Sequence, residues 1–273
     1  MPHSDHVLYP YPGPQLVRGA SGAPPPPAPW QARAANAPEL SLVAPVYNEV
    51  DNLRPLVARV IEVFGSRIAF ELVLVDDGSR DGSAELIREL ARSDPRVRGV
   101  LFERNCGQTA ATAAGIAYAR GRLIATLDAD MQNDPGDLPA MLERLGEHDA
   151  VVGFRIKRND DFVRRASSRV ANRVRNWISQ DDIRDTGCSL KLFRAEAIRS
   201  VPLFEGMHRF LPTLLRYHGF SVIEHGVSHH PRTKGTSKYG VWNRAFKATK
   251  DLFAVRWMKR RRLVIPVREV VGS

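Results

Sequence analysis

This sequence of 273 residues has little cysteine and no long apolar segment. Its two cysteines, Cys106 and Cys188, are too few for a disulfide framework, which favours a reducing, cytoplasmic compartment. No apolar run reaches the roughly 18 to 20 residues that a membrane-spanning helix needs. The N-terminus also lacks the basic region and apolar core of a signal peptide. We therefore predict a chain that does not cross a bilayer.

Two nucleotide-binding signatures are missing as well. No Gly-x-Gly-x-x-Gly follows the first predicted strand, and no Gly-Lys-Ser/Thr loop occurs. These absences argue against a dinucleotide site and against a P-loop.

Positive charge is concentrated near the C-terminus. Between Arg232 and Arg262 there are eleven basic residues and one acid, Asp251, and this excess of ten equals the net charge of +10 of the whole chain. Such a patch favours an anionic partner, which can be nucleic acid, an acidic protein or a surface of lipid headgroups.

Composition divides the chain into three parts. Residues 1–38 hold ten of the 19 prolines and little that could form a core, which predicts a disordered or polyproline arm. Residues 39–240 alternate strand-like and helical runs, which predicts an α/β domain with a mostly parallel sheet covered by helices on both faces. Residues 241–273 form a tail. The predicted strands are 40–46, 70–75, 97–102, 123–127 and 150–154, and the predicted helices are 52–64, 83–91, 109–119 and 138–145.

Polar motifs follow four of these strands, and ligands bind beyond the carboxyl ends of the strands in such sheets. The last motif places Asp128 and Asp130 one residue apart after an apolar run. Oxygen ligands of this kind suit Mg²⁺ or Mn²⁺, which commonly take further ligands from substrate phosphates. The alternative is that both aspartates only cap the turn. The four motifs are Ala44-Pro45-Val46-Tyr47-Asn48-Glu49, Asp76-Asp77-Gly78-Ser79, Arg104-Asn105-Cys106-Gly107 and Asp128-Ala129-Asp130.

With these motifs in order, the sequence resembles the family 2 glycosyltransferases of the GT-A fold, a Rossmann-like α/β architecture. It is most similar to the branch that transfers a sugar to a polyprenyl phosphate, typified by dolichol-phosphate mannose synthase. The match covers about Leu40 to Tyr239 and includes further motifs, which are Met131-Gln132, Asp134-Pro135, Gly153-Phe154-Arg155 and Arg232-Thr233-Lys234-Gly235-Thr236-Ser237-Lys238-Tyr239.

The resemblance implies a role for each matched residue. The metal, Mg²⁺ or Mn²⁺, would be held by Asp128, Asp130 and Gln132. A catalytic group would contain Asp130, Asp185 and three cations that surround the phosphates, Arg155, Arg232 and Lys238. A sugar nucleotide and a lipid phosphate bring about four negative charges into one cleft, and Arg suits phosphate geometry. The donor nucleotide sugar would be bound by Pro45, Tyr47, Glu49, Val75, Asp76, Asn105, Gly107, Asp128 and Ala129.

On the acceptor side, a predicted helix over 161–178 carries Arg164 and Ser168 one turn apart. The resemblance implies that both contact the acceptor phosphate. The helix is rich in arginine, so a solvated basic face is the alternative, and Arg165 is an alternative partner. A phosphate acceptor has a second pKa of about 6 and is already the nucleophile at neutral pH, so Asp185 would orient a group rather than remove a proton. We expect His208 to be structural.

The C-terminal tail departs from the family pattern, because many relatives end in membrane-spanning helices. The spacing of Trp242, Phe246, Leu252 and Phe253 predicts an amphipathic helix over 241–258, followed by basic residues 259–262. This arrangement suits an interfacial helix on the anionic cytoplasmic surface of a membrane, and a membrane partner subunit is a second way to reach it. A helix packed on the domain is the alternative.

The sequence thus predicts an inverting, metal-dependent transfer of a sugar to a polyprenyl phosphate. Mannose from a GDP donor is nearest to the resemblance, and glucose or an amino sugar from a UDP donor remains open. One alternative is transfer to a glycan hydroxyl, which is weakened because Phe253 occupies the Gln position of a Gln-x-x-Arg-Trp motif. Another is a nucleic-acid-binding protein, in which the strand-end motifs would have no role. We therefore expect no nucleic acid partner.

Overall fold

The computed structural model describes residues 37–65, 67–156, 182–202, 204–231 and 241–261, with the side chains of 241–250 left out. The chain forms two compact units. The first runs to Asp160 and resumes from Ile183 to Lys238, and the second contains Asp161–Asp182 and Tyr239–Ser273.

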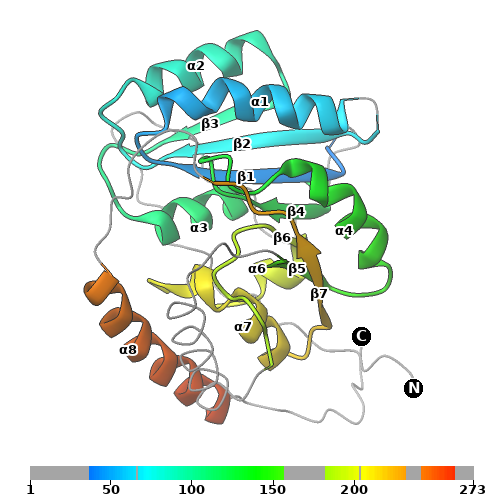
Figure 1. The fold of residues 1–273 in the computed structure, drawn as a ribbon, viewed down its shortest axis with the longest axis vertical. Helices are drawn as coiled ribbons and strands as arrows, with labels where there is room; N and C mark the ends of the chain where they lie inside the picture. Colours follow the sequence, from blue (N-terminus) through cyan, green and yellow to red (C-terminus); the bar gives the residue numbers. More distant parts are fainter. Residues whose placement is uncertain (1–36, 66, 157–181, 203, 232–240, 262–273) are drawn as a thin grey trace, which may run out of the picture. The chain divides into compact units, whose positions relative to one another are not determined.

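The first unit is built on a seven-stranded sheet in the order β3-β2-β1-β4-β6-β5-β7 (Figure 1). Strand β6 runs antiparallel to β4 and β5, and every other neighbouring pair is parallel. The prediction of a mostly parallel sheet is confirmed. The strands are β1 (Leu40–Val46), β2 (Phe70–Asp76), β3 (Val97–Leu101), β4 (Leu123–Thr126), β5 (Ala150–Arg155), β6 (Lys191–Arg194) and β7 (Val222–Val227).

The helices of this unit cover both faces of the sheet, as predicted (Figure 1). The five strands and four helices predicted for this part are confirmed, with ends that differ by at most two residues. The sequence pattern did not reveal β6 and β7. The helices are α1 (Val50–Phe64), α2 (Ser83–Ser93), α3 (Gln108–Tyr118), α4 (Leu138–Leu145), α6 (Ala195–Arg199) and α7 (Leu211–Tyr217), with short 3₁₀ turns η1 (Pro135–Asp137) and η2 (Met207–Arg209).

Strand periodicity divides the core between these faces, because successive side chains of a strand point to opposite sides. In β1, Leu40, Leu42, Ala44 and Val46 join one apolar cluster with residues of α1, α2 and α4. Val43 points to the other face, where a Cβ at Gly115 of α3 would clash with it. The glycine therefore allows α3 to lie close against the sheet.

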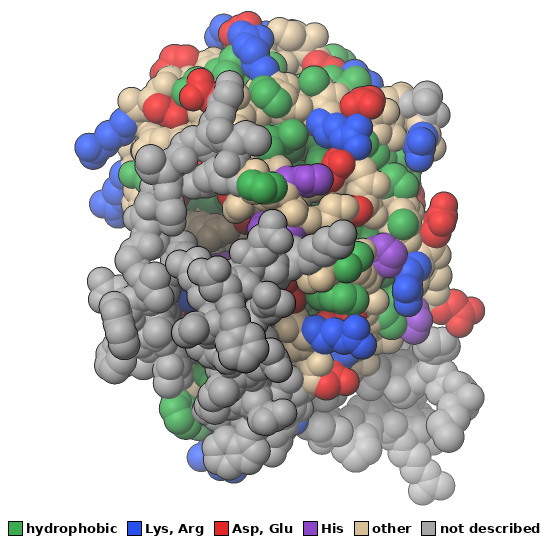
Figure 2. Space-filling view, viewed as in Figure 1, with side chains coloured by type: hydrophobic (Ala, Val, Ile, Leu, Met, Phe, Trp, Pro, Cys, Tyr) green, Lys and Arg blue, Asp and Glu red, His purple; other side chains and the backbone are tan. Residues whose placement is uncertain are grey.

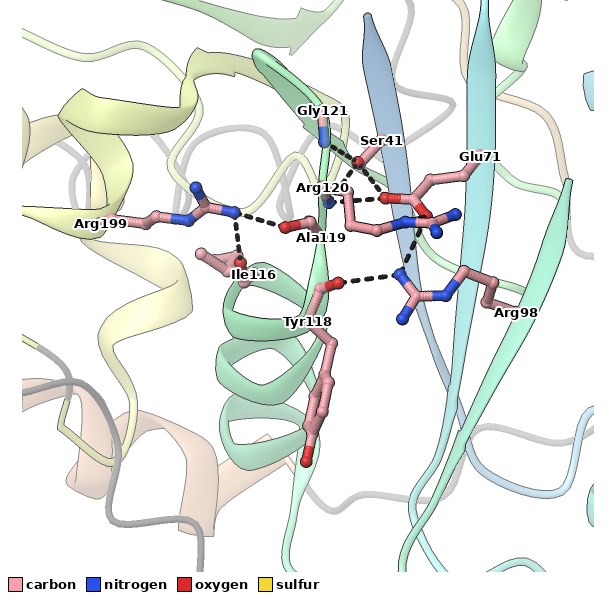
Figure 3. Close-up of polar contacts among 9 residues, drawn as sticks. All are labelled: Ser41, Glu71, Arg98, Ile116, Tyr118, Ala119, Arg120, Gly121 and Arg199. Atoms are coloured by element: carbon pink, nitrogen blue, oxygen red, sulfur yellow. Dashed lines mark hydrogen bonds and ion pairs between the residues drawn. The ribbon is translucent and has the colours of Figure 1, made fainter. Parts of the chain in front are cut away.

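An ion-pair network centred on Glu71 joins the starts of several strands (Figure 3). Glu71 is buried, with 1% of its surface exposed. Its carboxylate accepts hydrogen bonds from Ser41 Oγ at 2.6 Å, the Arg120 backbone N–H at 2.6 Å and Arg98 Nη1 at 2.9 Å. Burial alone raises the pKa of Glu71, but the bonds from Ser41, Arg120 and Arg98 outweigh it and hold the pKa below its usual value. The network links β1, β2, β3 and the turn before β4.

The second unit contributes one described helix, α8 (Val241–Arg260), in the segment predicted to be helical. Leu252 and Val255 are buried, whereas Phe253 and Trp257 are 58% and 61% exposed, so apolar side chains occupy more than one side of its final turns. Among the described residues, no helix combines the length and apolar character needed to span a membrane. The predicted helix over 161–178 lies outside the described residues.

Candidate functional site

The predicted donor residues meet at the carboxyl edge of the sheet. Strand β1 has β2 on one side and β4 on the other, so the strand order reverses there. Parallel α/β sheets bind ligands in the crevice at such a reversal. The register pairs Pro45 with Val75 and Val46 with Asp76, which places three predicted donor residues side by side.

The carboxylate of Asp76, at this edge, has one oxygen with a hydrogen-bond donor and one without, among the described residues. The residue is 1% exposed, and its Oδ2 accepts a hydrogen bond from the Ser79 backbone N–H at 3.1 Å. Its buried Oδ1 has no hydrogen-bond partner within the part of the chain that the structure describes. A buried carboxylate oxygen without a donor is costly, so this atom fits a donor group on a ligand, such as the N–H of a nucleobase.

The neighbouring Asp77 has the opposite character, because its oxygens are fully used within the protein. Oδ1 accepts from the Cys106 backbone N–H at 2.6 Å, and Oδ2 accepts from Gly107 N–H at 2.9 Å and Asn105 Nδ2 at 2.8 Å. Burial raises the pKa of Asp77, against the effect of these backbone bonds. Asp77 thus positions the loop that contains Asn105 and Gly107, whose contact with the donor stays a prediction.

The loop after β1 is fixed to the loop after β2. Asn48 has a positive φ of 52°, unusual for a residue other than glycine. Its N–H donates to Ser79 Oγ at 2.8 Å, and its Oδ1 accepts from the Arg80 N–H at 2.8 Å. Glu49, at the start of α1, accepts from Asn52 Nδ2 at 2.7 Å. These bonds give Tyr47 and Glu49 a defined place beside Asp76.

The predicted metal ligands lie in the turn after β4. Asp128 accepts a hydrogen bond from Gln108 Nε2 at 3.0 Å, and Asp130 accepts one from the Gln132 backbone N–H at 3.2 Å. Met131, between Asp130 and Gln132, has a positive φ of 60°, a strained conformation of the kind that concentrates at functional sites.

This ligand set fits a hard cation. The described residues contain no cluster of three or more His, Cys, Asp or Glu side chains suited to a metal. Two half-buried carboxylates and the amide of Gln132 fit Mg²⁺ or Mn²⁺, which keep several positions for water and substrate phosphate.

A backbone hydrogen bond and an ion pair stabilise the chain around this turn. The His230 N–H donates to the Gln132 carbonyl at 2.9 Å, and Asp134 forms a two-bond ion pair with Arg59 at 2.9 and 3.0 Å. The bonds from Arg59 lower the pKa of Asp134. The described residues end at 231, so Arg232 and Lys238 of the predicted basic motif lie outside them.

Arg155, predicted to lie among the substrate phosphates, is at the end of β5 and is paired with Asp185. The distances are 2.7 Å from Nε to Oδ2 and 2.9 Å from Nη2 to Oδ1, with both side chains less than one-fifth exposed. Asp185 therefore orients Arg155 in this structure, and the roles of both residues towards the acceptor stay predictions. Arg164 and Ser168 lie outside the described residues, so their predicted contact with the acceptor is not described.

His208 bridges two elements near this edge. Its Nδ1 lies 2.7 Å from Thr109 Oγ1, and that hydroxyl accepts from the Gly206 N–H at 3.0 Å. The hydroxyl of Thr109 and the imidazole of His208 thus connect α3 with η2. The structural role expected of His208 stays a prediction.

Sequence reasoning assigned no role to three residues that the structure places at or below this edge. Asp77 positions a loop, Gln108 donates to Asp128, and Lys191 is buried in β6. A single lysine inside the apolar run Leu190-Lys191-Leu192-Phe193 was a signal that could have been noticed.

The fold and this edge define a GT-A glycosyltransferase domain. A mannosyltransferase from Pyrobaculum calidifontis, solved with GDP-Man and Mn²⁺, has a TM-score of 0.58 at 19% identity and covers 90% of this chain and 68% of its own. Glucosyl-3-phosphoglycerate synthase from Mycobacterium tuberculosis, solved with Mn²⁺ and UDP, has a TM-score of 0.61 at 16% identity and covers 81% and 80%. At these identities the likeness shows the fold alone.

The glycosyl transferase family 2 model matches residues 41–201, and the chain belongs to this family. Dodecaprenyl-phosphate galacturonate synthase of Rhizobium johnstonii is 44% identical over 229 residues, which are 81% of this chain and 68% of that protein. Undecaprenyl-phosphate 4-deoxy-4-formamido-L-arabinose transferase of Edwardsiella ictaluri is 40% identical over 205 residues, 74% and 63% of the two chains. The chain thus spans about two thirds of the length of these relatives, and the prediction of a family 2 glycosyltransferase is confirmed.

Proposed function

We propose that this protein transfers a sugar from a nucleotide sugar to a polyprenyl phosphate, with Mg²⁺ or Mn²⁺ as cofactor. The observation that carries the proposal is that the unsatisfied buried oxygen of Asp76 and the Asp128 and Asp130 pair follow β2 and β4, the two parallel neighbours of β1, at one edge of the sheet. The first suits a nucleobase and the second suits a cation bound to a diphosphate. Relatives at 44% and 40% identity, named for a polyprenyl-phosphate sugar product or acceptor, support the lipid phosphate as acceptor.

The chemistry requires more positioning than proton transfer. An oxygen of the acceptor phosphate attacks the anomeric carbon while the bond to the nucleoside diphosphate breaks on the opposite side, which inverts the configuration. Because the phosphate oxygen already carries negative charge at neutral pH, no base is needed. Arg155, oriented by Asp185, and the predicted cations Arg232 and Lys238 offset the phosphate charges. A bound divalent cation would supply further stabilisation of the departing diphosphate.

The names of the relatives suggest which sugar the donor carries. Galacturonate and 4-deoxy-4-formamido-L-arabinose are the sugars named in proteins at 44% and 40% identity, whereas the mannosyltransferase is similar only in fold. We therefore place these two sugars before mannose as donors to be tested.

The proposed acceptor also suggests where in the cell the enzyme acts. A polyprenyl tail remains in the bilayer, so the enzyme has to reach the membrane surface. The excess of basic residues in 232–262 and the exposed Phe253 and Trp257 of α8 support attachment to an anionic cytoplasmic surface. On the described part of the face shown in Figure 2, acidic and basic side chains are interspersed.

The test is a direct transfer assay. Purified protein is incubated with Mn²⁺, a short polyprenyl phosphate and a panel of nucleotide-linked galacturonate, formamido-arabinose, mannose and glucose, and the lipid product is identified by mass. One donor should give a polyprenyl-phosphate sugar, and EDTA should abolish it. Transfer to an added glycan hydroxyl, with no lipid product from any donor, would contradict the proposal.

A further inference from the structure

The carboxylate of Asp128, a predicted metal ligand, is contacted by a side chain from another element. Gln108 is the first residue of α3, and its Nε2 donates to Asp128 Oδ1 at 3.0 Å, although the two residues are 20 positions apart in the chain. An ionised carboxylate is an acceptor only, so the amide has to turn its N–H₂ group, rather than its carbonyl, towards Asp128. The chemistry of the pair therefore fixes which end of Gln108 faces the turn after β4.

The second predicted ligand, Asp130, is oriented in a different way. It accepts a hydrogen bond from the Gln132 backbone N–H at 3.2 Å, within its own turn. The local conformation of the turn therefore orients Asp130. The contact between Asp128 and Gln108 depends instead on where α3 begins.

The start of α3 is fixed on both sides of Gln108. In the preceding loop, the Asp77 carboxylate accepts from the backbone N–H groups of Cys106 and Gly107 at 2.6 and 2.9 Å. Gly107 has a positive φ of 95° where the chain turns into the helix. Within the helix, Thr112 Oγ1 donates to the Gln108 carbonyl at 2.8 Å. The Gln108 side chain thus extends from an ordered backbone, so its hydrogen bond requires less loss of conformational entropy than one from a mobile loop.

The donor on Gln108 carries no charge, which matters beside a predicted cation site. A lysine or arginine in this place could also orient Asp128, but its positive charge would repel a divalent cation. A neutral amide orients the carboxylate and leaves its negative charge available. Carboxylates that bind metals are commonly hydrogen-bonded to such a partner, and loss of the partner weakens metal binding or activity by roughly 10- to 100-fold.

We propose, building on the metal-dependent function proposed above, that Gln108 is a positioning residue that orients Asp128 for a Mg²⁺ or Mn²⁺ ion. Its amide acts through Asp128 rather than on the substrate. Asp77, which follows the proposed nucleobase acceptor Asp76, fixes the loop from which Gln108 extends. The orientation of a metal ligand after β4 is thereby set from the end of β2.

This role has a signature that a loosened loop does not have. Removing the donor of Gln108 should reduce the factor by which Mn²⁺ raises nucleotide affinity, and it should leave nucleotide affinity without metal unchanged. A change that only loosens the preceding loop, which contains the predicted donor-binding residues Asn105 and Gly107, should weaken nucleotide binding both with and without the cation.

The test uses two variants of this exposed side chain. Gln108→Met removes the hydrogen-bond donor and keeps the length of the side chain, and Gln108→Ala removes the side chain beyond Cβ. Calorimetry measures the affinity for UDP and GDP with and without Mn²⁺. The factor due to Mn²⁺ should fall about three- to tenfold in both variants, a smaller change than that for a buried partner, because water competes for this bond. Nucleotide affinity without metal should stay within about twofold of the parent, and the melting temperature within about 2 °C.

A direct measurement and a control complete the test. Electron paramagnetic resonance gives the Mn²⁺ affinity of the nucleotide-loaded protein, which should fall by the same factor because the two affinities are linked. Thr112→Val is the matched control, since Thr112 is 5% exposed and its hydroxyl bonds the Gln108 carbonyl. It loosens the first turn of α3 and leaves the Gln108 side chain in place. Thr112→Val should lower the melting temperature and keep the factor due to Mn²⁺ within about twofold of the parent.

The outcomes separate this inference from the proposed function. A loss confined to the factor due to Mn²⁺ in both Gln108 variants, and absent in Thr112→Val, supports the positioning role. An unchanged factor, equal losses with and without metal, or the same loss in Thr112→Val overturns the positioning role while the proposed function stands. A parent protein whose nucleotide binding does not respond to Mn²⁺ overturns both the positioning role and the metal in the proposed function.

Discussion

Asp76→Asn changes one buried carboxylate to an amide of nearly the same size. In the parent, Oδ2 accepts from the Ser79 N–H and Oδ1 has no partner among the described residues. The amide can keep the first bond through its oxygen, but it brings no negative charge to the position of Oδ1. The substitution therefore removes the proposed nucleobase acceptor and leaves the turn formed.

The two consequences have opposite signs. A hydrogen bond to a charged group contributes about 1.5–3 kcal/mol, so the dissociation constant of the nucleoside diphosphate should rise by roughly 10- to 150-fold. The amide Nδ2 that takes the place of Oδ1 also lacks a partner, but a neutral group costs less to bury than a charged one. A net gain of about 1 kcal/mol should therefore raise the melting temperature by about 2–4 °C in a domain of this size. The site would thus gain stability as it loses function.

Calorimetric titration with UDP and GDP measures the first effect, and thermal unfolding without ligand measures the second. Asp77→Asn is the matched control, because Asp77 is equally buried but is bonded to the Asn105–Gly107 loop. It should lower the melting temperature. If Asp76→Asn binds nucleotide as the parent does, or loses as much stability as Asp77→Asn, then Asp76 only forms its turn and the reasoning fails.

Three further predictions concern the metal ligands, the buried network and the tail. Asp130→Asn should lower transfer activity by at least about a hundredfold, the scale of losing a key charge-stabilising group, and unchanged turnover at saturating donor would refute the metal assignment. Because the pKa of Glu71 is lowered in the fold, its ionisation stabilises the protein above the ordinary value of about 4.3, and that contribution is lost as the pH falls toward the lowered value. Thermal unfolding between neutral pH and pH 3 should therefore show a shallower acid decline in Glu71→Gln, and parallel curves would contradict this. Truncation after Tyr239 should leave a nucleotide-binding domain that no longer sediments with anionic liposomes, and equal sedimentation of both forms would place the attachment elsewhere.

Much of the fold could be predicted from local sequence. Apolar runs such as 40–46 and 70–75 became β1 and β2 because parallel strands covered on both faces need nearly continuous apolar residues. The motifs after β1, β2 and β4 were found for a similar reason, since the carboxyl ends of parallel strands meet at one edge. Strands β6 and β7 were missed because β6 has four residues with a charge at each end and β7 carries Glu224 and His225 in its middle.

Within the site, the sequence predicts which residues take part but does not reveal which groups they are bonded to. Asp76 and Asp77 are adjacent and chemically identical, yet one has an unsatisfied oxygen and the other holds a loop. The difference arises because the Asp77 side chain points towards the Asn105–Gly107 loop. That contact joins residues nearly thirty positions apart in the chain. Likewise, Arg155 was predicted to lie among the phosphates, and only the fold showed that Asp185 orients it.

The sequence by itself determined the class of this protein: the alternation of strands and helices, the order of the strand-end motifs and the membership of family 2 all follow from residues close together in the chain. Only the tertiary structure decided how charge is distributed around the site. The antiparallel insertion of β6 between β4 and β5 buries Lys191, whose Nζ donates to the Cys188 carbonyl. Strand register and direction are set by packing across the sheet, and the interaction of buried charges depends on that packing rather than on their spacing along the chain.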